Sequence, residues 1–89
     1  MKIKIEKIFS KDIKKFKDKE LNLKIFNLIN EIKDIPNISE IKNIKKLKNS
    51  KYAYRIRMGD YRFGIEYYDD YIIFVRFLHR KEIYKYFPK

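Results

Sequence analysis

Residues 52–67, YAYRIRMGDYRFGIEY, alternate between large apolar side chains and small or charged ones, and this alternation constrains the fold more than any other feature. A period of two is typical of a β-strand that buries one face. Gly59-Asp60 interrupts the alternation with a dipeptide suited to a two-residue hairpin turn, because glycine readily adopts a positive φ at the first turn position. The stretch therefore predicts a β-hairpin with one apolar face.

The turn sets the register of this hairpin. Counting outward from it gives apolar pairs on one face: Met58 with Tyr61, Ile56 with Phe63, Tyr54 with Ile65, and Tyr52 with Tyr67. On the other face Arg57 lies opposite Arg62, and Arg55 lies opposite Gly64. Directly opposed like charges destabilise a sheet, so an anion bound between them would relieve a cost. We predict a phosphate-binding face, with arginines solvated or paired with an acid such as Glu66 as the alternative.

Two neighbouring positions allow more than one interpretation. Gly64 either leaves room for a ligand beside Arg55 or marks a β-bulge. The third strand, 71–78, follows Asp69-Asp70, which we interpret as turn residues rather than a catalytic pair. A three-residue turn over 68–70 would place Arg76 beside Arg62, whereas a two-residue turn would direct it toward the core. We favour the first, because burying an unpaired guanidinium is costly.

The rest of the chain supplies helices and one more strand. Residues 2–8 alternate as an amphipathic strand, and Ser10 stands where a helix N-cap belongs. Residues 11–35 have apolar spacing of three to four, which indicates one or two helices with a break near Lys19 and Glu20. Residues 37–51 are expected to form a linking loop with a short turn, and 79–87 a short helical turn. The expected order is β-α-α-β-β-β, a single α+β domain over 1–89 with two N-terminal helices packed on a mostly antiparallel sheet.

Charge points to an anionic partner. The formal net charge is +11 in 89 residues, which favours binding to phosphate backbones or to an acidic protein. The first 51 residues contain 15 lysines and no arginine, whereas residues 52–80 contain all five arginines and no lysine. Arginine binds phosphate through a planar fork of donors and stays charged when crowded. Its confinement to the predicted sheet favours a phosphate site there.

Composition also excludes several classes of protein. The chain has no cysteine and one histidine, so disulfides, thiolate metal sites and ordinary histidine metal sites are excluded, and we expect no metal and no cofactor. There is no apolar run of membrane-spanning length and no secretory signal. We expect a soluble, cytoplasmic protein without membrane contact.

The end of the predicted third strand carries a further candidate group. By default His79 is solvated or lies at the edge of the core, but it stands beside Arg80. Tyr84 lies five residues further on and could return to the same end of the sheet. Its phenol could stack on a nucleic-acid base or donate a proton.

The segment LKNSKYAYRIRMGDYRFGIEY, followed by a hydrophobic strand and HRKEIY, resembles the RelE/ParE superfamily of toxins from toxin–antitoxin systems. The resemblance covers the whole chain in length and element order and is most specific from Leu47 to Tyr84. It implies the same β-α-α-β-β-β fold. It also implies a metal-independent endoribonuclease that cuts mRNA in the ribosomal A site. A cognate acidic antitoxin would neutralise it, and operator DNA would be bound only through the antitoxin complex.

The resemblance also implies roles for individual residues. Arg55 and Arg57 would orient a ribose 2′-OH, while Arg62 and Arg80 would stabilise charge on the phosphorane that forms when it attacks its own 3′ phosphate. Tyr84, with His79 as the alternative, would stack on the base or move a proton. Further RNA contacts are expected from Arg76, Lys48, Lys51 and Lys81.

Two other functions fit the same fold. A ParE-like toxin would act on DNA gyrase instead of cutting RNA, and a catalytically silent module would only bind RNA or a protein partner. The set of arginines on one face favours the nuclease over both.

Overall fold

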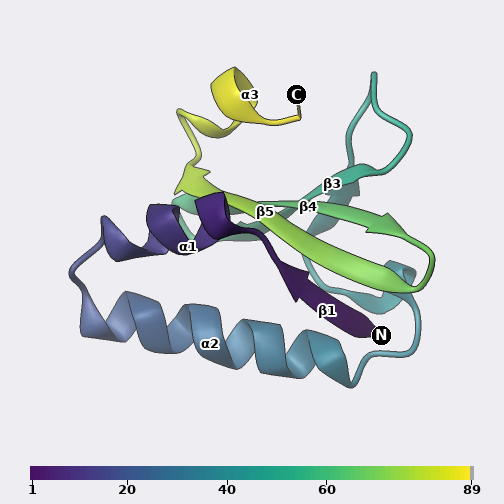
Figure 1. Cartoon of the computed structure of the whole chain (residues 1–89), viewed down its shortest axis with the longest axis horizontal. Coiled ribbons are helices and arrows are strands. Elements are labelled where there is room, and N and C mark those ends of the chain that lie inside the picture. Colours follow the sequence, from purple (N-terminus) through teal and green to yellow (C-terminus); the bar gives the residue numbers. More distant parts are fainter. Residues whose placement is uncertain (89) are drawn as a thin grey trace.

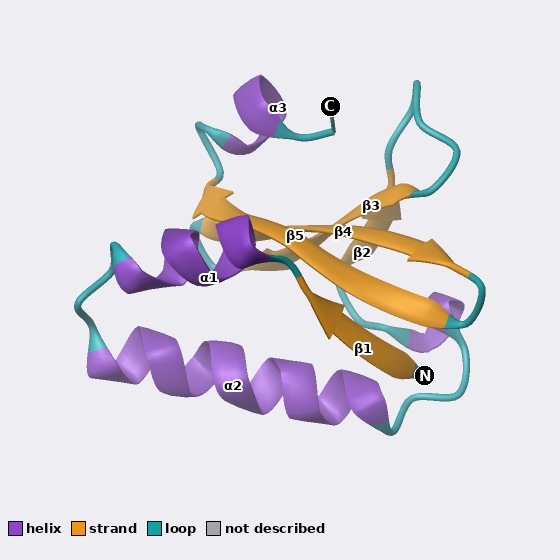
Figure 2. Ribbon diagram, in the orientation of Figure 1, coloured by secondary structure: helices purple, strands orange, loops and turns teal. Residues whose placement is uncertain are grey.

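A five-stranded sheet of order β1-β5-β4-β3-β2 forms the centre of the structure, a computed structural model that describes residues 1–88. β1 is parallel to β5, and the other neighbouring pairs are antiparallel. The elements are β1 (Lys2–Ile5), α1 (Lys7–Lys14), α2 (Lys19–Lys33), the 3-10 helix η1 (Ile38–Glu40), β2 (Ile44–Lys46), β3 (Ala53–Met58), β4 (Tyr61–Tyr68), β5 (Tyr71–His79) and α3 (Ile83–Tyr86). Figures 1 and 2 show α1 and α2 on one side of the sheet and α3 on the other. The predicted α+β fold with a mostly antiparallel sheet is confirmed.

The hairpin of β3 and β4 has the predicted register. Met58 is paired with Tyr61, and Arg57 is paired with Arg62. Gly59 has a φ of +58°, a conformation that favours glycine because it has no Cβ. The alternation of the sequence and its turn dipeptide were therefore sufficient to set this pairing.

The N-terminal segment differs from the prediction. β1 ends at Ile5, and α1 begins at Lys7, so Ser10 lies within the helix and does not cap it. The last bond to the neighbouring strand is donated by the Glu6 N–H to the Phe74 carbonyl, after which the chain turns into the helix. The expected break near Lys19 is confirmed, because α2 begins there with Asp18 as its cap; the carboxylate of Asp18 accepts the Leu21 N–H at 3.1 Å.

The segment expected to be a linking loop contains a fifth strand. After η1, the three residues of β2 pair with β3 at the edge of the sheet. The Arg57 N–H continues this ladder by donating to the Asn43 carbonyl at 3.0 Å. Asn43 has a φ of +63°, which asparagine tolerates better than most residues. A strand of this length carries too few residues to produce a visible alternation.

Two apolar clusters pack on opposite faces of the sheet. The larger lies under α1 and α2, where Phe9 packs against the rings of Phe63 and Phe74 with centroids 6.0 Å and 5.4 Å away. The smaller lies under α3 and contains buried Leu47, Ala53, Ile83 and Phe87. The face opposite the long helices is thus partly covered by the C-terminal segment. None of the helices within residues 1–88 is both long enough and apolar enough to cross a membrane.

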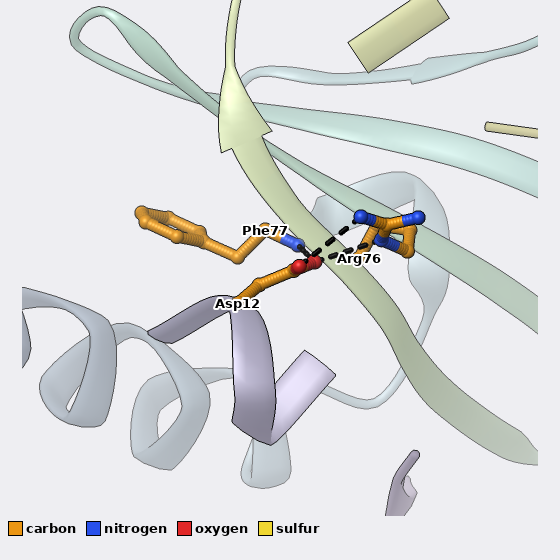
Figure 3. A network of polar contacts seen from close by, with 3 residues as sticks. All are labelled: Asp12, Arg76 and Phe77. Carbon is orange, nitrogen blue, oxygen red and sulfur yellow. Dashed lines mark hydrogen bonds and ion pairs between the residues drawn. The ribbon is translucent and has the colours of Figure 1, made fainter. Parts of the chain in front are cut away.

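The position predicted for Arg76 is wrong. The turn before β5 has two residues, Asp69 and Asp70, both with positive φ, and a register shift next to Gly64 places Arg76 opposite that glycine. Arg76 is nevertheless buried, because its Nε and Nη2 donate to the carboxylate of Asp12 at 2.8 Å and 3.1 Å (Figure 3). The same carboxylate accepts the Phe77 N–H at 3.0 Å. The burial cost that argued against this position is offset by a partner on α1.

Gly64 serves the chain's own packing. A Cβ built at this position would lie 2.7 Å from the ring of Phe87, far inside van der Waals contact. The register shift lies between Gly64 and Ile65, and the extra residue is Val75 of β5, so the irregularity is on the neighbouring strand rather than at Gly64 itself. The space beside Arg55 that was interpreted as room for a ligand is filled by the C-terminal segment.

Candidate functional site

Three arginines share the face of the sheet that carries α3, and we call Arg55, Arg57 and Arg62 the arginine face. Their strand register alternates with that of buried Ile56 and Phe63, which belong to the core under α1 and α2. They therefore lie opposite the long helices. Lys45 of β2 is paired with Arg55 and extends the same row of basic residues.

Asn43 holds the two arginines of β3. Its carbonyl accepts a hydrogen bond from Arg55 Nη1 at 3.1 Å, and its side-chain Oδ1 accepts one from Arg57 Nη2 at 3.3 Å. Both acceptors are neutral, so the guanidinium charges are oriented without being neutralised. Each guanidinium keeps further N–H donors for a ligand.

Arg62 lies at the centre of the positive charge. Its Nη1 donates to the carbonyls of Gly59 at 2.8 Å and Tyr61 at 2.9 Å, which folds the side chain back over the hairpin turn. Partial burial is the main cause that lowers the pKa of Arg62 below its ordinary value, followed by the charges of Arg55 and Arg57. Arg80 also lowers this pKa, whereas Tyr84 raises it. The electrostatic environment of Arg62 thus includes every arginine of the predicted site together with Tyr84.

The positive charge of the arginine face is uncompensated. Within residues 1–88, no Asp or Glu carboxylate lies within 4.0 Å of the guanidinium of Arg55, Arg57 or Arg62. Arg80 is 3.9 Å from Asp60, but both side chains are exposed, and such a pair contributes little. Pairing with acids, the alternative considered from the sequence, is therefore absent from this face in the described part of the chain. An anion with several oxygens, such as a phosphate, complements the arrangement.

Tyr84 extends from α3 beside a basic cleft. The cleft has a volume of about 620 Å³ and is lined by Lys45, Lys48, Tyr84 and Phe87 among others. The side chain of Tyr84 is 61% exposed, so its ring and hydroxyl are available to a ligand. In Figure 1 the loop between β2 and β3 and the α3 segment rise from the same side of the sheet.

His79 lies on the other face. It is paired with Tyr61, whose ring packs in the core under the long helices, and the two rings meet edge to face with centroids 5.8 Å apart. Its Nδ1 accepts the Lys81 N–H at 3.2 Å. Of the two candidates for the acid or base, Tyr84 is therefore the one on the side of the arginines.

The other predicted RNA contacts are dispersed. Lys48 lines the basic cleft, Lys51 has its Nζ 5.6 Å from the ring centroid of Tyr52, and Lys81 is exposed after β5. Arg76 is occupied by Asp12 and stacks on the ring of Tyr86 at 5.4 Å, which removes it from the predicted contacts. Among residues 1–88, no group of three His, Cys, Asp or Glu side chains is placed to hold a metal ion.

Two residues of the site were not found from the sequence. Asn43 and Lys45 belong to the segment interpreted as a loop, and their contribution depends on the pairing of β2 with β3. The lysine-rich composition around them gave no indication of which lysine would face the arginines. An asparagine just before the lysines was the one available signal, since asparagine favours the positive φ found there.

Comparison with known proteins identifies relatives, although no family model matches the chain. Over 35 residues it is 69% identical to Toxin RelE3 of Methanocaldococcus jannaschii, a match that covers 39% of this chain and only 40% of that protein. It also matches a chain of the RelB–RelE antitoxin–toxin complex from Methanococcus jannaschii, with 41% identity and a TM-score of 0.79. YafQ from E. coli strain BL21(DE3) has the same fold at 19% identity, with a TM-score of 0.66 over 89% of this chain and 92% of that one.

The match to the RelB–RelE complex covers 96% of this chain and 99% of the other, so the shared identity extends along nearly both full lengths. The shorter match, which has the higher identity, is to a RelE toxin, so the counterpart of this chain in the complex is RelE and not RelB. The resemblance seen in the sequence is confirmed: this chain belongs to the RelE family of toxins.

Proposed function

We propose that this chain acts as a single domain, as the toxin of a type II toxin–antitoxin system, and that it is an endoribonuclease that cuts mRNA on the ribosome. One observation carries the proposal: Arg57 is paired with Arg62, Arg55 lies on the same face, and no carboxylate within residues 1–88 pairs with any of the three, while Arg80 and Tyr84 also act on the charge of Arg62. Such a set binds a phosphate diester and stabilises additional negative charge on it. A sheet face with only a structural role gains nothing from like charges placed opposite each other.

The proposed reaction is an internal transfer of the phosphodiester bond. The ribose 2′-oxygen attacks its own 3′ phosphate, the bond from phosphorus to the 5′-oxygen of the next nucleotide breaks, and a 2′,3′-cyclic phosphate and a 5′-OH result. The 2′-OH loses a proton, and the leaving 5′-oxygen gains one. Arg55 and Arg57 orient the nucleophile and its phosphate, while Arg62 and Arg80 stabilise the charge of the phosphorane. The guanidinium groups supply the positive charge that a metal ion provides in other nucleases, so the reaction is proposed to need no metal.

Tyr84 has two candidate roles, stacking on a base or transferring a proton, and two substitutions distinguish them. Tyr84→Phe keeps the ring and removes the hydroxyl, whereas Tyr84→Ala removes both. A cleavage rate lost in both variants assigns proton transfer, and a rate lost only in the alanine variant assigns stacking. Tyr86→Phe is the matched control, because Tyr86 is exposed on the same helix.

The deciding experiment is cleavage of mRNA on programmed ribosomes, mapped by primer extension, with and without EDTA. We expect cuts within codons that leave a 5′-OH and persist when divalent ions outside the ribosome-bound pool are chelated. Intact mRNA together with DNA gyrase inhibition would identify a ParE-like activity instead. Intact mRNA and unaffected gyrase would leave a binding module and refute the nuclease.

A second part of the proposal concerns the partner. We propose that an acidic antitoxin neutralises the chain by covering the arginine face, and that operator DNA is bound only by the toxin–antitoxin complex. The uncompensated charge supports an acidic partner, and the relative from Methanococcus jannaschii occurs in a complex with RelB. Adding the polypeptide encoded beside this chain should stop cleavage, with an association rate that falls as salt rises. Operator binding by the free toxin would contradict this part.

A further inference from the structure

Three tyrosines gather at the opposite end of the sheet from Arg57 and Arg62, and we call Tyr52, Tyr68 and Tyr71 the tyrosine strip. Tyr68 and Tyr71 are directly paired across β4 and β5. The ring of Tyr52, just before β3, lies 5.1 Å from the ring of Tyr68, with the two planes inclined at 41°. The side chains of Tyr52 and Tyr68 are 41% and 50% exposed, so this stacked pair remains accessible to solvent.

Lysines surround the strip. Lys51 Nζ lies 5.6 Å from the ring centroid of Tyr52, and Lys2 and Lys4 place their Nζ atoms 5.3 Å and 5.5 Å from that of Tyr71. All three lysines are exposed. The strip therefore combines flat aromatic surfaces with exposed positive charges, the two features with which proteins bind single-stranded nucleic acid without reading its sequence.

The strip lies on the same face of the sheet as the proposed catalytic site. Along β4, Arg62 and Tyr68 are an even number of residues apart and lie on the same face, since Phe63, Ile65 and Tyr67 between them belong to the core of the other face. Six residues of strand separate their Cα atoms by roughly 20 Å. Between them on this face of β4 lie Gly64, which the ring of Phe87 covers, and Glu66; the basic cleft lined by Lys45 and Lys48 lies beside the same C-terminal segment.

We propose that the tyrosine strip is a second RNA subsite, where bases of the single strand flanking the scissile phosphate stack on Tyr52 and Tyr68. The inference depends on the proposed function, because it takes RNA as the substrate of the arginine face. The lysines contact the phosphates, and the rings contact the bases. Asp69 and Asp70 in the adjoining turn are exposed carboxylates that weaken the attraction of the strip for phosphate, so base stacking provides the main contact there.

The test measures affinity for single-stranded RNA of two lengths. The probes are fluorescein-labelled 2′-O-methyl RNAs of about 12 and about 3 nucleotides, which cannot be cleaved for lack of a free 2′-OH. Tyr68→Ala and Tyr52→Ala should each weaken binding of the long probe by roughly tenfold. Binding of the short probe, which reaches only the arginine face, should stay within about twofold.

Two controls separate stacking from general damage. Tyr68→Phe keeps the ring and should bind the long probe as the unaltered chain does. Phe26→Ala removes an aromatic ring that is 65% exposed on α2, and it should also leave binding unchanged. Melting temperatures of all variants confirm that each chain is folded.

Several outcomes would overturn the inference. Equal affinity of the alanine variants for the long probe would refute the subsite, as would an equal loss for both probes. Weakened binding of the acidic antitoxin with unchanged RNA affinity would make the strip a protein interface. Failure of the proposed function is distinguished by the unaltered chain: if it leaves mRNA on programmed ribosomes intact, the nuclease proposal is wrong, whatever the strip binds.

Discussion

Arg57 and Arg62 face each other across the hairpin with no carboxylate nearby, and this predicts opposite effects of their removal on stability and on activity. Arg57→Ala removes the repulsion at the cost of one exposed hydrogen bond to Asn43. We expect the melting temperature to stay the same or rise by up to about 5 °C. Single-turnover cleavage on ribosomes should fall by roughly tenfold to a thousandfold.

Arg62→Met tests the same point with the side-chain stem retained. The pKa of Arg62 is lowered, which means that the folded chain disfavours the charged form of this side chain. Losing the charge in Arg62→Met should therefore not destabilise the fold. Lys24→Ala, on the exposed surface of α2, is the control for simple loss of positive charge. Variants of Arg57 and Arg62 that melt far lower but cut at the normal rate would show that these arginines are structural.

For single residues, the sequence predicted the surroundings correctly where the neighbouring residues are close in the chain. The opposition of Arg57 and Arg62 follows from a two-residue turn and four apolar pairs, all within one hairpin. The environment of Arg76 does not, because its partner Asp12 lies on α1 and meets it through the tertiary fold. No periodicity in the sequence connects two residues that far apart.

The packing of α3 on β4 depends on the contact between Gly64 and Phe87. In Gly64→Ala the new methyl would lie 2.7 Å from the ring, and we expect a loss of about 1–3 kcal/mol in urea unfolding. In the double variant Gly64→Ala/Phe87→Ala the ring is gone, so the loss should be smaller than the sum of the two single losses by about 1 kcal/mol or more.

Gly59→Ala is the matched control for this cycle. Gly59 has a φ of +58° and open space around a built Cβ, so alanine there costs backbone strain without a contact. Its effect should add to that of Phe87→Ala. If the losses of unfolding free energy for Gly64→Ala and Phe87→Ala also add, Phe87 does not contact Gly64.

The ion pair of Asp12 and Arg76 joins α1 to β5, and breaking it is expected to lower the free energy of unfolding. Asp12→Ala leaves a buried guanidinium without its partner, which should cost about 3–5 kcal/mol of unfolding free energy. Asp12→Leu/Arg76→Met removes both charges and should cost much less, apart from the Phe77 N–H that loses its acceptor. Equal destabilisation in the single and double variants would contradict a role for the charge pair.

Elements were predicted well where they are long and poorly where they are short. The helices and β3 to β5 carry enough residues for a period to be visible, and the break before α2 coincides with a capping aspartate. β2 has three residues, and its pairing with β3 decides whether Asn43 and Lys45 belong to the site. The start of α1 depends on where β1 stops pairing with β5, which is a property of the sheet rather than of the local sequence.

The charge of the whole molecule predicts a steep salt dependence of RNA binding. Each phosphate contact to a single strand contributes a slope of about −0.7 in log affinity against log salt, so four contacts predict a roughly 50-fold loss between about 50 and 200 mM salt. Fluorescence anisotropy with the uncleavable long RNA would measure it, and Arg57→Ala should reduce the slope. An affinity that is constant across this range would count against binding through a surface of charge +11.

The parallel pairing of β1 with β5 has a consequence for when the toxin becomes active. Lys2 pairs with Tyr71 and Ile5 with Phe74, so the first strand cannot find its place until most of the chain exists. Closing so long a loop is entropically costly and favours late formation of that edge. We expect a nascent chain to remain incompletely folded until β5 has left the exit tunnel, which would keep the proposed nuclease activity off while its own message is being read.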